Sequence, residues 1–109
     1  MVTFIETKLF TRLVQDYLSD DSYRQFQTAL ASDPEAGPLI PRSGGLRKLR
    51  WGIPGHGKRG GLRVIYYVKM KQEEIWLLTL YPKNLAENIP SHVLRQIKKE
   101  IDDEKDKSS

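Results

Sequence analysis

Residues 62–81 read LRVIYYVKMKQEEIWLLTLY, and this stretch decides the fold. Two runs rich in β-branched and aromatic residues, 62–69 and 74–81, are separated only by MKQE (70–73), which is short enough for a hairpin turn. We therefore expect two antiparallel strands. The run IWLLTL (75–80) is apolar at nearly every position, which predicts a central strand that is buried on both faces.

The segment before this hairpin predicts strands and helices in turn. Residues 2–5 form a short β-branched and aromatic run, typical of a first strand, and LRKLRW (46–51) predicts another. Thr7 can cap one helix, and residues 19–21 offer caps for a second helix that ends at Asp33–Pro34. Because so few residues join the two helices, they should form an antiparallel helical hairpin.

After the last strand, Pro90 and Ser91 open a final helix whose apolar residues fall on one face. The order of elements predicts an α+β protein, with a mostly antiparallel sheet of four to five strands between an N-terminal helical hairpin and a C-terminal helix. Residues 1–104 should form a single domain, and the charged residues 105–109 a frayed tail.

Composition excludes several classes of protein. The chain has 109 residues, 29% of them charged, with no cysteine and two histidines, so disulfides, thiol chemistry and a zinc site are not expected. The opening MVTFIETKLF lacks the pattern of a signal peptide, and no apolar run approaches the roughly 20 residues that span a bilayer. We expect a cytoplasmic protein without a membrane partner and without a cofactor.

Charge is strongly segregated along the chain. The net charge is +4, yet residues 36–72 contain no Asp or Glu. This acid-free segment carries nine cations: Arg42, Arg47, Lys48, Arg50, Lys58, Arg59, Arg63, Lys69 and Lys71. Such a segment either binds a polyanion or protects exposed strands from aggregation, and its length favours the polyanion.

Alternation along the strands sorts these cations by face. In LRKLRW, Lys48 and Arg50 share one face, and in the next strand Arg63 shares its face with Ile65 and Tyr67. If the two strands pair, Lys48, Arg50 and Arg63 converge. Cations from the glycine-rich loop, Lys58 and Arg59, and from the strand end, Lys83, could join them around a phosphate chain.

Tyr67 has two interpretations. Among these cations it would offer a ring on which a base could stack, or it could simply pack against its neighbours on the sheet surface. The sequence leaves both open.

The order of elements, with GGLRKLRW (44–51), GKRGGLRVIYY (57–67) and LLTLYPKN (77–84), resembles the RelE/ParE superfamily of bacterial toxins, in particular its RelE/HigB-type branch. The resemblance covers nearly the whole chain. It implies a type II toxin–antitoxin toxin that enters the ribosomal A site and cuts mRNA as a ribosome-dependent endoribonuclease, or mRNA interferase, and so inhibits translation. The implied partner is a cognate antitoxin, often a helix-turn-helix protein, through which alone operator DNA would be contacted.

Carried over to this chain, the family's strand arginine falls on Arg63 and its basic pair on Lys48 and Arg50. The cation after the last strand falls on Lys83. Many relatives read YGKNE where residues 81–85 read YPKNL. The C-terminal tyrosine or histidine that some relatives use in catalysis has no clear counterpart, since no tyrosine follows Tyr81. The predicted RNA-binding residues are Arg47, Arg50, Lys58, Arg59, Tyr67 and Asn84.

The predicted chemistry depends on charge. Arg63 would hold the phosphate, and Lys83 would stabilise the transition state or protonate the leaving oxygen. Lys48 would act as base, with a pKa lowered by its cationic neighbours, and no metal would be needed. His56 is an alternative base, although its place between two glycines gives it little support.

Two other functions are compatible with this sequence. ParE-like relatives share the scaffold but inhibit DNA gyrase, and a basic sheet alone could be a non-catalytic RNA-binding module. The clustering of cations on two strands and a strand end favours the nuclease.

Overall fold

The structure, a computed structural model, describes residues 1–52, 61–83 and 90–108. It contains the strands β1 (Thr3–Glu6), β2 (Arg47–Trp51), β3 (Leu62–Lys69) and β4 (Glu74–Pro82). Its helices are α1 (Lys8–Tyr17), α2 (Asp20–Ser32) and α3 (Ser91–Ser108), with a 3-10 turn over Met70–Gln72. Residues 105–108, expected to be frayed, belong to α3, and their fraying in solution stays a prediction.

The four strands form one sheet in the order β1-β4-β3-β2. β3 pairs antiparallel with both β4 and β2, and β1 pairs parallel with β4. The hairpin over residues 62–81 is therefore the centre of the sheet, as predicted. The tight turn between its strands ends at Glu73, which adopts a left-handed conformation with φ 54°.

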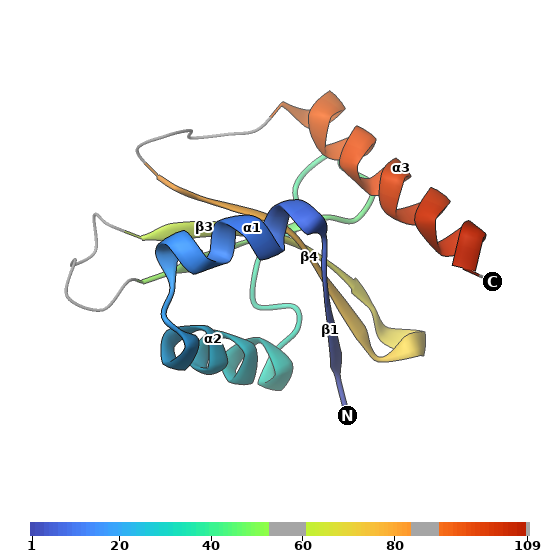
Figure 1. Ribbon diagram of the computed structural model, residues 1–109. Coiled ribbons are helices and arrows are strands. Elements are labelled where there is room, and N and C mark those ends of the chain that lie inside the picture. The colour runs from blue at the N-terminus through green and yellow to red at the C-terminus, as the bar shows by residue number, and fades with distance from the viewer. Residues whose placement is uncertain (53–60, 84–89, 109) are drawn as a thin grey trace.

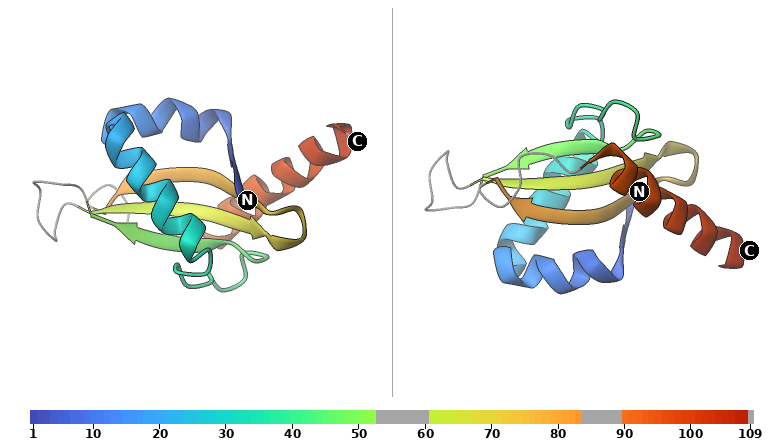
Figure 2. Two further views of the ribbon diagram at one scale, coloured as in Figure 1. Left: turned by 90° about the horizontal axis from the view of Figure 1, so that it is seen from below. Right: turned by 90° about the horizontal axis from the view of Figure 1, so that it is seen from above.

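Helices cover both faces of the sheet. Figures 1 and 2 show α1 and α2 against one face, diverging from the turn that joins them, and α3 crossing the other face. The α1–α2 face has the larger core, which includes Phe10, Phe26, Val64, Tyr66 and Leu77. The α3 face has a smaller core of Leu46, Ile65, Leu78, Tyr81 and Leu94. The prediction that the 75–80 run is buried on both faces is thus confirmed.

A β-bulge divides the residues of β4 between these two cores. Ile65 pairs with Thr79 and the next residue, Tyr66, pairs with Leu77, so Leu78 has no partner of its own across the ladder. The extra residue lets Leu78 pack under α3 while Leu77 and Leu80 still face α1 and α2.

The caps predicted for the helices are present. The Thr7 hydroxyl accepts a hydrogen bond from the backbone N–H of Phe10 and donates one to the carbonyl of Leu78, which ties the start of α1 to β4. The Ser19 hydroxyl accepts from the backbone N–H of Ser22 and caps α2.

One carboxylate joins the first three elements. Oε2 of Glu6, at the end of β1, accepts a hydrogen bond of 2.5 Å from the Tyr23 hydroxyl on α2. Its Oε1 accepts one of 2.6 Å from the Thr11 hydroxyl on α1. Burial, together with the charge and hydrogen bond of Glu6, raises the pKa of Tyr23.

We expect Tyr23→Phe to lower the free energy of unfolding by about 1.5 kcal/mol, because it removes a donor to a charged acceptor.

The raised pKa of Tyr23 gives a second expectation, which concerns the pH dependence of stability. The folded protein holds the phenolic proton more tightly than the unfolded chain, so wild-type stability should fall as the pH rises above the ordinary tyrosine pKa of about 10. Denaturant melts between pH 7 and 11 should show a shallower loss for Tyr23→Phe. Equal slopes would contradict the role of this hydroxyl.

Candidate functional site

The strand register aligns three polar side chains across the α3 face of the sheet. Arg50 on β2 lies opposite Arg63 on β3, and Arg63 lies opposite Tyr81 on β4. Directly paired residues point to the same face, so the three side chains form a row. Lys48, opposite Ile65, lies on the same face in the neighbouring row. The predicted convergence of Lys48, Arg50 and Arg63 is therefore supported by the register.

Arg63 is a buried cation, with 8% of the residue exposed. Within residues 1–52, 61–83 and 90–108, no carboxylate or other acceptor forms a hydrogen bond or ion pair with its guanidinium. Gly61 lies beside this group, and an added Cβ there would make ordinary contacts, 3.6 Å from Nη1 of Arg63 and 3.4 Å from the carbonyl oxygen of Trp51. A charge held this way is costly unless an anion approaches it.

Beside Arg63, the Tyr81 hydroxyl is a buried polar group without a partner. Tyr81 is 9% exposed, and its hydroxyl makes no hydrogen bond to the described part of the chain. Burial raises the pKa of Tyr81, and the charge of Arg63 opposes that rise. Buried hydroxyls nearly always have partners, so an unpaired one beside an unpaired cation indicates a place for a ligand.

Tyr81 is not among the site residues that the sequence predicts, where it enters only as part of the YPKN motif. The sequence nevertheless contains a signal for this role, since Tyr81 is the one tyrosine in the apolar run of β4 and ends that run two residues before Lys83.

The row lies at one end of the sheet, where β2 ends and β3 begins. The backbone N–H of Lys83 donates to the carbonyl of Gly61 at 3.3 Å, which extends the β3–β4 ladder by one step beyond Pro82. Lys83 is exposed, and continued alternation from Tyr81 places it on the side of Arg63. In Figure 2, α3 crosses the face away from these strand ends.

Four of the candidate residues cannot be placed. His56, Lys58 and Arg59 in the glycine-rich loop, and Asn84 after the last strand, lie outside the described residues.

Arg47 lies on the opposite face from the other candidates, because it pairs with Tyr66. Its Nη1 donates to the carbonyl oxygens of Gly37 at 2.8 Å and Glu35 at 3.4 Å, and its Nη2 is 3.9 Å from the Glu35 carboxylate. The structure thus gives Arg47 a role in holding the loop before β2, and RNA contact by Arg47 stays a prediction.

Tyr67 shares the face of Arg63 but not its neighbourhood. It is four residues further along β3, or about 13 Å at the usual strand rise. There its ring contacts the cations Lys98 on α3, with Nζ 5.2 Å from the ring centre, and Lys69, at 5.7 Å. A Cβ on Gly45 would lie 3.2 Å from the Tyr67 ring. These contacts match the packing interpretation of Tyr67, and the partner on α3 could not be read from the strand pattern.

The described residues contain no group of three or more His, Cys, Asp and Glu side chains that could hold a metal ion. None of the described helices is long and apolar enough to cross a membrane.

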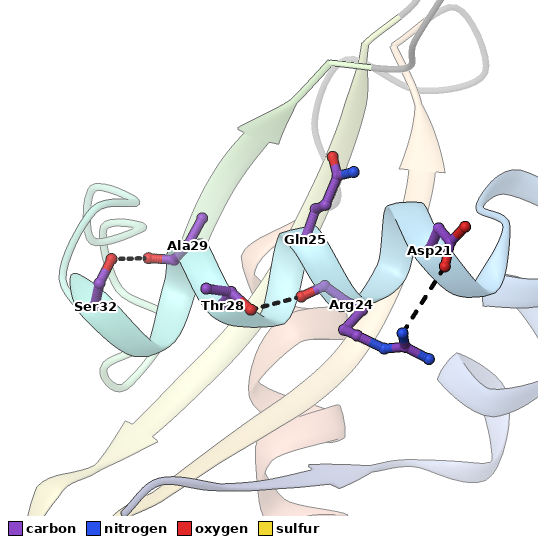
Figure 3. Close-up of a pocket in the computed structure, with 6 residues that line it drawn as sticks. All are labelled: Asp21, Arg24, Gln25, Thr28, Ala29 and Ser32. Carbon is purple, nitrogen blue, oxygen red and sulfur yellow. Dashed lines mark hydrogen bonds and ion pairs between the residues drawn. The ribbon is translucent and has the colours of Figure 1, made fainter.

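A hollow of about 540 Å³ lies on the outer side of α2 (Figure 3). All of its lining residues come from that one helix: Asp21, Arg24, Gln25, Thr28, Ala29 and Ser32. Several polar groups along it have partners within the helix, such as Thr28, whose hydroxyl donates to the carbonyl of Arg24. We therefore place the functional site at the Arg63 row and not here.

Comparison with known proteins bears on the fold. No family model matches the sequence. Among solved structures, the chain is similar to a mutant of the Escherichia coli toxin RelE in the free state, with a TM-score of 0.51 and 14% identity over 79% of this chain and 87% of that one. A metal-bound toxin from Helicobacter pylori also matches, with a TM-score of 0.44 and 19% identity over 77% of this chain and 97% of that one. The likeness to the Escherichia coli structure shows that the fold is RelE-like, as the sequence predicted.

The unpaired Tyr81 hydroxyl leads to a stability prediction. We expect Tyr81→Phe to raise the free energy of unfolding by about 1 kcal/mol, because it removes a buried hydroxyl that lacks a partner. This gain corresponds to roughly 4–8 °C in melting temperature for a domain near this size.

Tyr66→Phe is the matched control for this prediction. The Tyr66 hydroxyl donates to the carbonyl of Pro34 at 2.8 Å and accepts from the backbone N–H of Gly37 at 2.9 Å. Its loss should therefore lower the free energy of unfolding by about 1–3 kcal/mol. Thermal melts of both variants measure the contrast, and a loss of stability in Tyr81→Phe would show that its hydroxyl has a partner.

Proposed function

We propose that this protein is a toxin of a type II toxin–antitoxin system that cuts ribosome-bound mRNA without a metal ion. The observation that carries the proposal is the buried pair of Arg63 and Tyr81, whose polar groups have no partner among the described residues. Two such groups on one face favour a ligand that is anionic and accepts hydrogen bonds, and a phosphodiester satisfies both. The RelE-like fold agrees with this choice.

The surrounding cations fit a phosphate chain better than a single small anion. Arg50 lies one strand away from Arg63, Lys48 lies on the same face, and Lys83 lies at the adjoining strand end. An RNA strand that crosses the end of the sheet would bring successive phosphates past these side chains. The exposed position of Arg50 and Lys83 leaves them accessible to that strand.

The proposed reaction is attack of the 2′-hydroxyl on the adjacent phosphorus, which forms a bond to the 2′-oxygen and breaks the bond to the 5′-oxygen. Arg63 holds two oxygens of the phosphate and stabilises the charge that grows on them, and the Tyr81 hydroxyl donates to one of these oxygens. Lys48 accepts the proton of the attacking hydroxyl, and Lys83 gives a proton to the leaving oxygen.

The ribosome would supply the positioning of the RNA, which these residues alone do not provide. An in-line attack needs the 2′-oxygen, the phosphorus and the 5′-oxygen in a row, and holding reacting atoms in place can contribute several of the roughly 7–11 kcal/mol available from positioning. We propose that mRNA in the A site is held in this geometry. A cognate antitoxin, of the helix-turn-helix type, would neutralise the toxin in the cytoplasm.

The competing function is gyrase inhibition, which the shared fold also permits. The buried Arg63–Tyr81 pair favours the nuclease, because binding to a protein surface does not require a recessed anion site. Purified translation and gyrase supercoiling reactions separate the two. A nuclease stops translation and leaves cleaved message, whereas a gyrase inhibitor stops supercoiling and leaves translation intact.

We expect the purified protein to cut a labelled message on programmed ribosomes at least about 100-fold faster than the same message free in solution, because free RNA is not held in line. Chelator added to the free-RNA reaction should change nothing. Primer extension of the message gives both rates. Efficient, chelator-sensitive cleavage of free RNA would contradict the proposed mechanism.

Arg63→Ala should lower the rate on ribosome-bound message by about 10²–10³, the usual cost of losing one group that stabilises an oxyanion. The matched control is Arg24→Ala, which removes an exposed arginine from α2 on the other side of the sheet. It should cut at the wild-type rate. A fully active Arg63→Ala protein with a wild-type circular dichroism spectrum would place the phosphate site elsewhere.

Replacing both Lys58 and Arg59 with glutamine tests the predicted loop contacts. If both residues contact phosphates, the slope of log binding constant against log salt should become shallower by about 1.4, at roughly 0.7 per phosphate of single-stranded RNA. Fluorescence anisotropy with a short labelled RNA at several salt concentrations measures this slope. An unchanged slope would assign the two cations to a solvated edge.

A further inference from the structure

The segment before β2 is fixed along the outer edge of the sheet. Leu39 forms a bridge with Arg47, and the backbone N–H of Lys48 donates to the carbonyl of Pro38 at 3.1 Å. β2 is the last strand of the sheet, so residues 36–39 follow its otherwise open edge only as far as Lys48. Leu49 and Arg50 continue beyond the end of this pairing.

The same segment is also held from the core. The Tyr66 hydroxyl bonds to both Pro34 and Gly37, and the Arg47 guanidinium donates to the Gly37 carbonyl at 2.8 Å. Gly37 is so close to β2 that an added Cβ would lie 2.9 Å from the backbone carbon and oxygen of Lys48. These contacts make the segment a fixed wall, because a shift would break several buried hydrogen bonds at once.

A hollow of about 310 Å³ lies between this wall and β2. Ala36, Pro38 and Leu49 supply apolar surface, and Lys48 and Arg50 supply cations. Its size is at the lower end of small-molecule sites, and its mixture of apolar walls with polar groups is typical of them. The lining belongs to the acid-free segment 36–72.

We propose that this hollow binds the base of a nucleotide next to the phosphate held by Arg63. The inference rests on the proposed function, because it assumes that a phosphate occupies the Arg63 row. Arg50 connects the two places, since it lies opposite Arg63 and also lines the hollow. Neighbouring strands are about 4.8 Å apart, so the edge of β2 is within reach of the adjoining nucleotide.

The lining matches a base in three ways. Pro38 and Leu49 give apolar contact, the guanidinium of the exposed residue Arg50 can stack on a ring, and backbone groups at the edge of β2 can bond to the base edge. Arg47, predicted as an RNA ligand, then acts from the opposite face as a positioning residue for the wall. The hollow would contribute to the choice of cleavage site along the message.

The test fills the hollow without changing a cation. Ala36 is exposed and lines it, so Ala36→Phe should occupy the space, and Ala31→Phe on the exposed side of α2 is the matched control. The probes are the four ribonucleoside 5′-monophosphates and inorganic phosphate, each added to ¹⁵N-labelled protein and followed by NMR.

We expect at least one nucleotide to shift the amide signals of Gly37, Leu49 and Arg50, while phosphate shifts only signals near Arg63. Ala36→Phe should weaken nucleotide binding by about tenfold, within the range for loss of a stacked base, and Ala31→Phe should bind as wild type does. Equal shifts with nucleotide and phosphate, or unchanged binding in Ala36→Phe, would overturn the proposal. Shifts at these amides with the antitoxin but with no nucleotide would also overturn it, in favour of a protein partner.

Cleavage of ribosome-bound message by the same preparations separates this inference from the proposed function. If wild type cuts the message and Ala36→Phe cuts it at the same positions in the same proportions, the hollow does not read a base and the nuclease function stands. If wild type does not cut but nucleotides still shift the Gly37 and Leu49 amides, the hollow stands as a nucleotide site and the nuclease function fails.

Discussion

The pairing of β3 with β4 is the constraint on which the rest of the structure depends. Its register sets Arg63 against Tyr81 and, beyond the bulge, Tyr66 against Leu77. The first pair faces α3 and the second faces α1 and α2. One hairpin therefore divides the protein into a polar row at a strand end and a packed core. A shift by one residue would exchange the two faces and bury the site cation among Phe10 and Phe26.

The candidate site stores a cost that the core offsets. The Tyr81 hydroxyl is held out of water without a partner among the described residues, next to the largely buried cation Arg63, and each of these groups lowers stability compared with an apolar side chain. The larger core opposes this cost with fully buried Phe10, Phe26, Leu62 and Tyr66. Side chains that lower the stability of the free protein in this way are expected at a site that a ligand completes.

The wall beside β2 shows how the core also shapes the surface. Tyr66 is wholly buried against the α1–α2 helices, yet its hydroxyl fixes Pro34 and Gly37 on the rim of the sheet. Arg47 reaches the same glycine from the same face. Lys48 and Arg50, which lie on the other face, also line the hollow that these residues support. Its shape is thus set by side chains that do not line it.

The sequence by itself determined the strands, the helices and the face of each residue in β2 and β3, whereas in β4 the bulge at Leu78 places Leu77 and Tyr81 on opposite faces, against simple alternation. Period-two alternation around Arg63 and the four-residue turn before Glu74 are local properties, so they could be read without a structure. Only the tertiary structure decided which residues meet. The Arg63–Tyr81 pair requires the register across the hairpin, Tyr67 packs against Lys98 of α3, and Arg47 bonds to Gly37 because the loop before β2 folds back beside it. Alternation gives the face of a side chain only where the strand is regular. Contacts between residues remote in sequence are fixed by packing, which a local pattern does not contain.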